Sequence, residues 1–440
     1  MANSSETPKF PKPIPNPLAD PKSHLEVNLP LTQTLPLSPI LEDEKTDPEL
    51  VLSGLQPIPS LIESLPINGD TSTNPAFSPA SPASPPTPPV VKMPDLGLIN
   101  PFMKDPLVTE IMVNDMRSVL IEKEGKLQST QVVYKGIDEL NRLTRSILDI
   151  TGRILSPDQP YVDVMLPDGS RVNIVGPPLT IYGPCITIRK FPSRRMNLND
   201  LIKGEQLDQR MGYFLNACIL SRLNILISGG TGSGKTTLLS ALASLIPKQE
   251  RIITIEDTPE LFIESFNSVR LQTKLQTPTS NAITARDLVA NSLRMRPDRI
   301  IVGECRRSEA FDMLQAMNTG HLGSMTTLHA NSPRDALFRL ETLCMMAGAD
   351  IPLNAIRKQT VSALDLIIQV KRFRDGKRRV TAITEVTGME GEIITLQDLF
   401  LFESDLDGTD SGTFKSTGFV PSFIPRFRES GIELPKSYFE

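Results

Sequence analysis

The segment Gly229–Thr237, GGTGSGKTT, carries the most specific chemistry in this 440-residue sequence. It satisfies the pattern GxxxxGK(S/T), follows the apolar run NILIS and precedes the helix-like stretch TLLSALASLIP. Glycines at this spacing let successive backbone N–H groups turn toward nucleotide phosphates, where Lys235 neutralises charge and Thr236 ligates Mg²⁺. The segment therefore predicts a site for ATP and Mg²⁺, and its nucleotide-binding residues are Gly229, Gly230, Thr231, Gly232, Ser233, Gly234, Lys235, Thr236 and Thr237.

Acidic residues follow two other apolar runs of the same half of the chain. RIITI leads into Glu256, and RIIVG leads into Glu304. Two carboxylates near one Mg²⁺–ATP can divide the work, one supporting the metal and the other activating the attacking water. We assign metal support to Glu304 and water activation to Glu256, and the exchanged assignment is the alternative. Glu260 is a third candidate, to be weighed against a structural role.

Two of the three histidines, His321 and His329, flank the run SMTTL. A strand of this length would separate the imidazoles by about 15 Å, which is too far for one shared metal ion. His329 follows the run, where an imidazole can hydrogen-bond or sense the γ-phosphate. We therefore expect His329 to be catalytic and His321 to have a structural or subunit-interface role.

These side chains must be positioned by four short apolar runs, which are NILIS, RIITI, RIIVG and SMTTL. Each is short, rich in Ile or Thr and without a polar face, which is typical of strands buried on both sides of a mainly parallel sheet. Ligands of such sheets bind beyond the carboxyl ends of the strands. The pattern predicts an α/β, RecA-like P-loop NTPase domain with a doubly wound, mainly parallel sheet, in which the phosphate loop, both acids and His329 converge.

A smaller α+β domain is predicted before it. EIMVND, SVLIEKEGKL and STQVVYKG alternate as strands do, residues 136–152 have helical spacing ending at Gly152, and YVDVMLPDGSRVNIVGPP and CITIRKF predict further strands. More than half of the 39 prolines precede residue 95, which predicts a disordered tail. The expected boundaries are 1–92 for the Pro/Ser-rich tail, 93–192 for the α+β domain, 193–210 for a linker and 211–440 for the ATPase domain.

Composition argues against several other classes. The net charge is −5 with both signs mixed along the chain, so nucleic acid is not the expected ligand. Four isolated cysteines and no CxxC pair argue against a disulfide framework or a four-cysteine zinc module and fit a reducing cytoplasm. We expect no signal peptide and no integral membrane segment, because no apolar run approaches about 18 to 20 residues.

Taken together, the motifs resemble the type II/type IV secretion ATPase superfamily, and within it the CpaF-like ATPases that assemble Flp (tight-adherence) pili. GGTGSGKTTLL resembles the Walker A motif, ITIEDTPEL the Asp box, and the segment from LVANSLRMRPDRIIVGE to TTLHANSPRDALFRLETL the Walker B motif and His box. DPLVTEIMVND, LPDGSRVN, ITIRKF and RRVTAITEVTGMEGEIITLQDLF are also similar. The resemblance covers about residues 95–440.

This resemblance implies a cytoplasmic homohexamer that docks on an inner-membrane platform protein and drives pilus assembly or protein secretion. Matched to the family pattern, Arg171 and Arg189 are the arginines that reach the nucleotide phosphates from the first domain or its linker. The chain departs from the family in its proline-rich start and in Arg307, where glycine is common.

Two other functions stay open at this point. One is a nucleotide-binding scaffold or regulator with little hydrolysis, against which Glu256 and Glu304 argue. The other is a DNA-translocating, conjugation-type ATPase, against which the lack of a basic stripe and the segment RRVTAITEVTGMEG argue.

Overall fold

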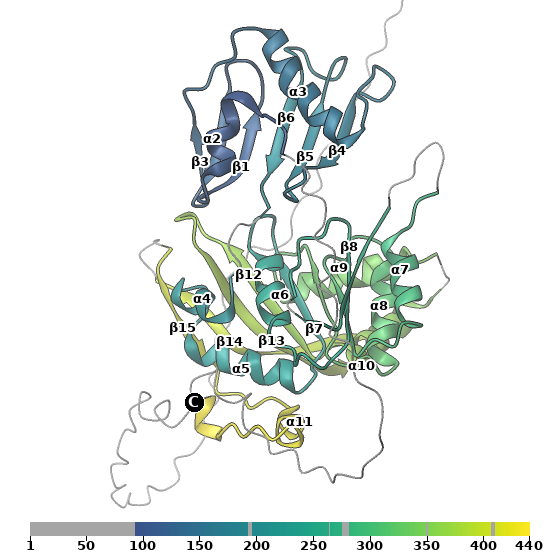
Figure 1. Ribbon diagram of the computed structural model, residues 1–440. Helices are drawn as coiled ribbons and strands as arrows, with labels where there is room; N and C mark the ends of the chain where they lie inside the picture. The colour runs from purple at the N-terminus through teal and green to yellow at the C-terminus, as the bar shows by residue number, and fades with distance from the viewer. Residues whose placement is uncertain (1–92, 192–195, 264, 275–280, 349–350, 406–409) are drawn as a thin grey trace, which may run out of the picture. The chain divides into compact units, whose positions relative to one another are not determined.

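The computed structural model describes residues 93–191, 196–263, 265–274, 281–348, 351–405 and 410–440 (Figure 1). The predicted tail, 1–92, and the first part of the predicted linker lie outside the described residues. The described chain contains a six-stranded and a nine-stranded sheet. These two sheets position all of the candidate site residues.

The six-stranded sheet is antiparallel, with strand order β3-β2-β1-β6-β5-β4. The long helix α3 (Ile137–Thr151) packs with it around a core that includes Ile111, Ile147 and Ile174. Gly152 ends this helix with φ 63°, as predicted. The other elements are η1 (Gly97–Ile99), α2 (Asn100–Lys104), β1 (Val108–Val113), β2 (Val119–Lys123), β3 (Lys126–Ser129), β4 (Tyr161–Met165), β5 (Arg171–Val175) and β6 (Cys185–Arg189).

One strand prediction in this region is wrong. SVLIEKEGKL forms two strands, β2 and β3, which turn at Glu124 and Gly125, both with positive φ. The segment STQVVYKG contributes only its first residue to β3. Tyr134 is buried, and its backbone N–H donates to the Met116 carbonyl at 2.8 Å. The alternating apolar residues here therefore anchor a loop to the core and do not form a strand.

The nine-stranded sheet is mainly parallel, with order β15-β14-β13-β12-β7-β11-β10-β8-β9. The strands from β12 to β9 are parallel neighbours, and β13, β14 and β15 extend the sheet antiparallel. The four predicted runs form β7 (Ile225–Gly229), β8 (Ile252–Glu256), β10 (Arg299–Val302) and β11 (Met325–Leu328). The remaining strands are β9 (Ser268–Gln272), β12 (Leu366–Arg372), β13 (Arg378–Glu390), β14 (Ile393–Ser404) and β15 (Gly412–Ser416).

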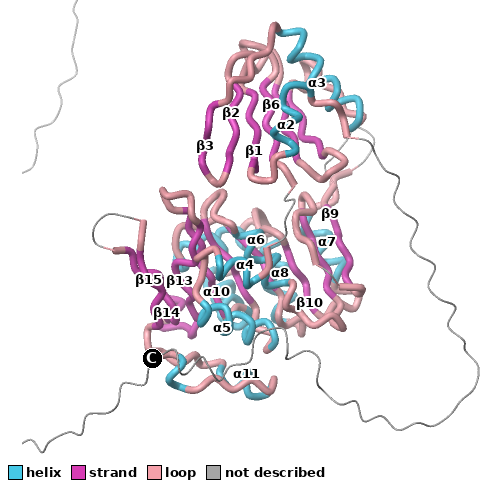
Figure 2. Tube along the Cα trace, turned by 60° about the vertical axis from the view of Figure 1, so that its left-hand side comes forward, coloured by secondary structure: helices cyan, strands magenta, loops and turns pink. Residues whose placement is uncertain are grey.

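Helices cover both faces of this sheet (Figures 1 and 2), which confirms the doubly wound α/β prediction. Successive strand residues point to opposite faces, so Ile225 and Ile227 join one core and Leu226 the other. The first core includes α4 (Leu198–Lys203), α5 (Gln209–Leu220), α6 (Lys235–Ala243) and α11 (Ile424–Glu429). The second includes α7 (Ala285–Ser292), α8 (Glu309–Asn318), α9 (Pro333–Met345) and α10 (Leu353–Ala363), and η2 (Lys436–Tyr438) lies near the end of the chain.

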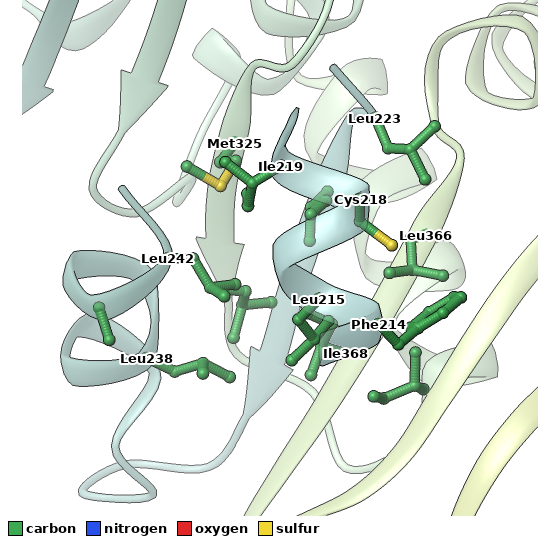
Figure 3. Packing of buried hydrophobic residues seen from close by; sticks show 14 of the residues in the cluster. Phe214, Leu215, Cys218, Ile219, Leu223, Leu238, Leu242, Met325, Leu366 and Ile368 are labelled. Carbon is green, nitrogen blue, oxygen red and sulfur yellow. The ribbon is translucent and has the colours of Figure 1, made fainter. Parts of the chain in front are cut away.

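Helix α5 anchors the first core (Figure 3). Its Phe214 and Cys218 are fully buried and pack with Leu366 and Ile368 of β12. The Phe214 ring also lies within 6.2 Å, between centroids, of four other phenylalanine rings, three of them from the last residues of the chain: Phe400, Phe423, Phe427 and Phe439. The chain's C-terminal segment is thus part of the first core of the nine-stranded sheet.

Candidate active site

The phosphate loop joins the end of β7 to the start of α6. Gly232 and Gly234 have φ of 69° and 96°, a region that favours glycine. At Gly229, an added Cβ would lie 2.3 Å from the Val370 carbonyl oxygen. Glycine is therefore required here by positive φ angles and by close backbone contact. Helix α6 begins directly at Lys235.

Lys235 lies at the centre of the site. Its Nζ donates to the carbonyls of Gly229 and Gly230, each at 3.0 Å, and lies 3.3 Å from His329 Nδ1. Burial lowers the pKa of Lys235 to about 8. Because an ammonium group has no acceptor, Nδ1 of His329 must accept from it. The proton of the neutral imidazole is then on Nε2.

His329 connects Lys235 to Glu304. Its Nε2 lies 3.0 Å from Glu304 Oε1, so the imidazole donates to the carboxylate. Burial and the neighbouring Lys235 charge lower the pKa of His329. The structure thus brings three predicted residues, from α6 and from the ends of β10 and β11, into one hydrogen-bonded chain.

Glu304 has a second partner that sequence reasoning missed. Its Oε2 accepts from Arg306 Nη2 at 2.9 Å, and Arg306 Nη1 lies 3.6 Å from Asp257 Oδ2. Burial raises the pKa of Glu304, but the Arg306 hydrogen bond and the nearby positive charges outweigh burial, so the net pKa is lowered. The sequence offered one signal for these contacts: Asp257 directly follows Glu256, and Arg306 lies two residues after Glu304.

Glu256 lies deeper than Glu304. Its residue exposure is 5%, and its Oε1 accepts from the backbone N–H groups of Glu260 and Leu261 at 2.9 and 2.8 Å. Its Oε2 is buried and has no hydrogen-bond partner among the described residues. Burial raises the pKa of this carboxyl group. Glu256 therefore holds the loop after β8 and presents one unsatisfied oxygen.

Arg171 and Arg189 share one carboxylate. They are cross-strand partners on β5 and β6, and their Nη1 atoms lie 3.2 and 3.7 Å from Glu260 Oε1. The third candidate acid is thus the ion-pair partner of both predicted arginines. One cleft contains nearly every predicted residue; its lining is Arg171, Arg189, Thr231, Gly232, Ser233, Gly234, Lys235, Thr236, Thr237, Glu256, Asp257, Thr258, Glu260, Gly303, Glu304, Arg306 and His329.

Three predicted or noted residues lie outside this cleft lining. Gly229 and Gly230 instead supply the two carbonyls that bind Lys235. His321 precedes β11, and its Nδ1 lies 3.2 Å from the Ala316 carbonyl oxygen. Within the described ranges, no group of three or more His, Cys, Asp or Glu side chains is arranged to hold a metal ion.

Arg378 is a further contact of the phosphate loop that the sequence did not indicate. It begins β13, and its Nε donates to the Gly232 carbonyl at 2.9 Å. Burial lowers the pKa of this guanidinium, with Arg372 contributing next. No local pattern links Gly232 and Arg378, which lie far apart in the chain, so only the fold reveals this hydrogen bond.

The sequence matches a family model described as type II/IV secretion system protein over residues 92–389. The chain belongs to this family. Members are ATPases, so this secretion-family ATPase hydrolyses ATP, and the cleft described above is its candidate nucleotide site. None of the helices in the described part of this ATPase is long and apolar enough to cross a membrane.

Relatives of this secretion-family ATPase carry several names. It is 32% identical to a putative conjugal transfer protein of Mycobacterium tuberculosis over 68% of this chain and 86% of the relative. It is 33% identical to the type IV secretion system protein VirB11 of Bartonella henselae (65% and 90%) and 34% identical to the type IV secretion system protein PtlH of Bordetella pertussis (66% and 93%). Among solved structures, the VirB11 ATPase of Brucella suis matches at 30% identity and a TM-score of 0.36, covering 65% of this chain and 91% of that one.

Proposed function

We propose that this secretion-family ATPase powers the assembly of a pilus of the Flp type, using Mg²⁺–ATP. The observation that carries the proposed mechanism is the hydrogen-bonded chain Lys235–His329–Glu304 at the carboxyl ends of parallel strands. In this chain, the imidazole of His329 links Lys235, which binds the phosphates, to Glu304, a carboxylate that can orient water. The support for the pilus branch is the resemblance of the motifs outside the nucleotide site.

The oxygen groups of the cleft fit Mg²⁺. This ion prefers oxygen ligands and retains several of its waters. Thr236 offers a hydroxyl at the start of α6, and Glu304 and Glu256 offer carboxylates. The unsatisfied, buried Oε2 of Glu256 suits a hydrogen bond from metal-bound water. When bound, Mg²⁺ would neutralise charge on the phosphates, held by Thr236 with help from these acids.

The geometry favours the exchanged assignment of the two acids. The side chain of Glu304 is 20% exposed and ionised, and it is one imidazole away from Lys235. Glu256 is more buried, and one of its oxygens is committed to two backbone N–H groups. We therefore propose that Glu304 orients and activates the attacking water, and that Glu256 supports the hydrated metal.

The variants Glu304→Gln and Glu256→Gln separate these roles. With Glu304→Gln, we expect kcat to fall by about 10²- to 10³-fold at saturating Mg²⁺, since one activating group is lost. With Glu256→Gln, we expect the Mg²⁺ concentration for half-maximal rate to rise. The opposite pattern would restore the first assignment, and equal, near-zero rates of wild type and Glu304→Gln would contradict the motor function and favour a nucleotide-dependent scaffold.

We further propose that Arg171 and Arg189 act on the phosphates. Both now pair with Glu260, and anionic phosphate oxygens would compete with that carboxylate for their guanidinium groups. Charge developing on the γ-phosphoryl group would be stabilised by either arginine. This exchange supplies a physical link between nucleotide and the sheet that carries β5 and β6.

The assembly we propose is a cytoplasmic homohexamer that associates with a membrane platform protein. The support is family membership together with the secretion-system names of the relatives. Light scattering with and without a slowly hydrolysed ATP analogue tests it, and a monomer under both conditions would contradict the ring.

DNA translocation is the competing function, because one relative is named as a putative conjugal transfer protein. Binding to DNA would be sensitive to salt and would stimulate hydrolysis. For a pilus motor we expect the ATPase rate to be unchanged by added duplex or single-stranded DNA at low salt. A salt-sensitive stimulation would favour the conjugation branch.

A further inference from the structure

Arg306 is a charged residue of the cleft that the proposed mechanism does not use. It lies two residues after Glu304, in the turn between β10 and α8, and its side chain is 52% exposed. The turn is held by Glu309, whose Oε1 accepts from the backbone N–H groups of Arg306 and Arg307 at 2.5 and 2.8 Å. Glu309, and not the Arg306 side chain, therefore holds the backbone of this turn.

The guanidinium of Arg306 bridges the ends of two parallel strands. It donates to Glu304, which follows β10, and lies within ion-pair distance of Asp257, which follows β8. These two strands are direct neighbours. The positive charge of Arg306 therefore offsets the repulsion between these two carboxylates.

The contacts of Glu304 define its orientation. One carboxylate oxygen binds His329 and the other binds Arg306. The terminal torsion of a glutamate is broad when nothing restrains it. Two contacts on different oxygens fix the carboxylate plane, and neither His329 nor Arg306 alone would do so. Such precision matters because a displacement of about 1 Å can lower a reaction rate by roughly 10²-fold.

We propose that Arg306 is a positioning residue that orients the Glu304 carboxylate for ATP hydrolysis. The inference rests on the proposed function of Glu304 and adds a residue to it. Arg306 acts through Glu304, so its removal changes the chemical step and leaves nucleotide binding largely intact. Its neighbour Arg307 is also exposed and binds Glu309 through its backbone N–H. It therefore provides a matched control.

The test compares steady-state ATP hydrolysis of the full chain with that of three single variants. For Arg306→Gln we expect kcat to fall by about 10- to 100-fold, with KM for ATP within about threefold of wild type. Arg306→Lys restores part of the rate, because it returns the charge without the forked geometry. Arg307→Gln stays near wild type in both parameters. Melting temperatures, measured in parallel, confirm that each variant is folded.

A double variant decides whether Arg306 acts through Glu304. Under single-turnover conditions, adding Arg306→Gln to Glu304→Gln should change the residual rate by less than about threefold, since the carboxylate to be oriented is already gone. Additive losses would overturn the inference, as would a raised KM with unchanged kcat, or a faster Arg306→Gln enzyme. A slow Glu304→Gln enzyme beside an unaffected Arg306→Gln enzyme would reject this inference alone. An inactive wild type would reject the proposed function.

Discussion

At the residue scale, the site depends on a neutral histidine. His329 accepts from Lys235 through Nδ1 and donates to Glu304 through Nε2. One imidazole therefore couples the position of the phosphate-binding lysine to that of a carboxylate. The sequence indicated that His329 lies at the catalytic edge, because it follows a buried strand. The two partners of its ring could not be predicted, since they depend on how β7, β10 and β11 align in the sheet.

Replacing His329 should affect turnover much more than binding. For His329→Ala we expect kcat to fall at least about 10-fold, with the Kd for a slowly hydrolysed ATP analogue changed by less than about threefold. The reason is that the phosphate loop and Lys235 remain in place. Nucleotide binding by fluorescence and steady-state hydrolysis check this. His321→Ala, at the other end of β11, is the control, and unchanged turnover of His329→Ala would remove this residue from the mechanism.

The lowered pKa of Lys235 makes nucleotide affinity depend on pH. Its pKa is about 8 because of burial, and bound phosphate would raise that value by stabilising the charged form. Binding then takes up a proton above pH 8, so affinity should weaken as pH rises above about 8, by up to about tenfold per pH unit. Isothermal titration between pH 7 and 9.5 in buffers of different ionisation enthalpy measures both effects. Constant affinity and no proton uptake would contradict the shift.

At the scale of elements, local patterns predicted the structure where a pattern is compatible with only one kind of element. The four buried runs became parallel strands, and α3 ended at Gly152. Predictions were less accurate where tertiary contacts decide. STQVVYKG alternates like a strand but forms a loop, because Tyr134 reaches the core. Within the expected linker, 193–210, Asn197 caps helix α4 and Asp208 caps helix α5.

The C-terminal segment should contribute strongly to stability. Phe427 is fully buried, and its ring lies 6.0 Å from that of Phe214. We expect Phe427→Ala to lower the free energy of unfolding by about 3 to 5 kcal/mol through lost burial and an unfilled cavity. Chemical denaturation measures it. Phe266→Ala is the matched control, because this side chain is 85% exposed and its loss should cost less than about 0.5 kcal/mol. Equal effects of the two substitutions would contradict the role of this segment.

At the scale of the whole molecule, the resemblance of the motifs anticipated family membership, and the structure adds the ion pairs that connect the arginines to Glu260. Neither SRVN nor ITIR contains a signal for that partner. The contacts appear only when β5 and β6 place Arg171 and Arg189 side by side. Long-range ion pairs of this kind join residues that no local spacing relates.

Removing either arginine should slow hydrolysis. For Arg171→Gln and Arg189→Gln we expect kcat to fall by about 10- to 10³-fold, because each guanidinium would stabilise charge on the phosphoryl group. Steady-state hydrolysis measures this, with the exposed Arg117→Gln as control. If these arginines act on a neighbouring subunit, mixing Arg171→Gln with Lys235→Ala should recover activity that neither variant has. Wild-type rates for both arginine variants would exclude them from the reaction.

The internal bonds of Lys235 make nucleotide capture an exchange reaction. Its Nζ already has two carbonyl partners and an imidazole, so an incoming phosphate must replace at least one of those bonds. The measured affinity is therefore a difference between two sets of bonds, and it understates how strongly the lysine holds phosphate. Changes in the loop that weaken the two carbonyl bonds would tighten nucleotide retention and so slow the release of ADP. The carbonyls of Gly229 and Gly230 would then help to set the turnover rate.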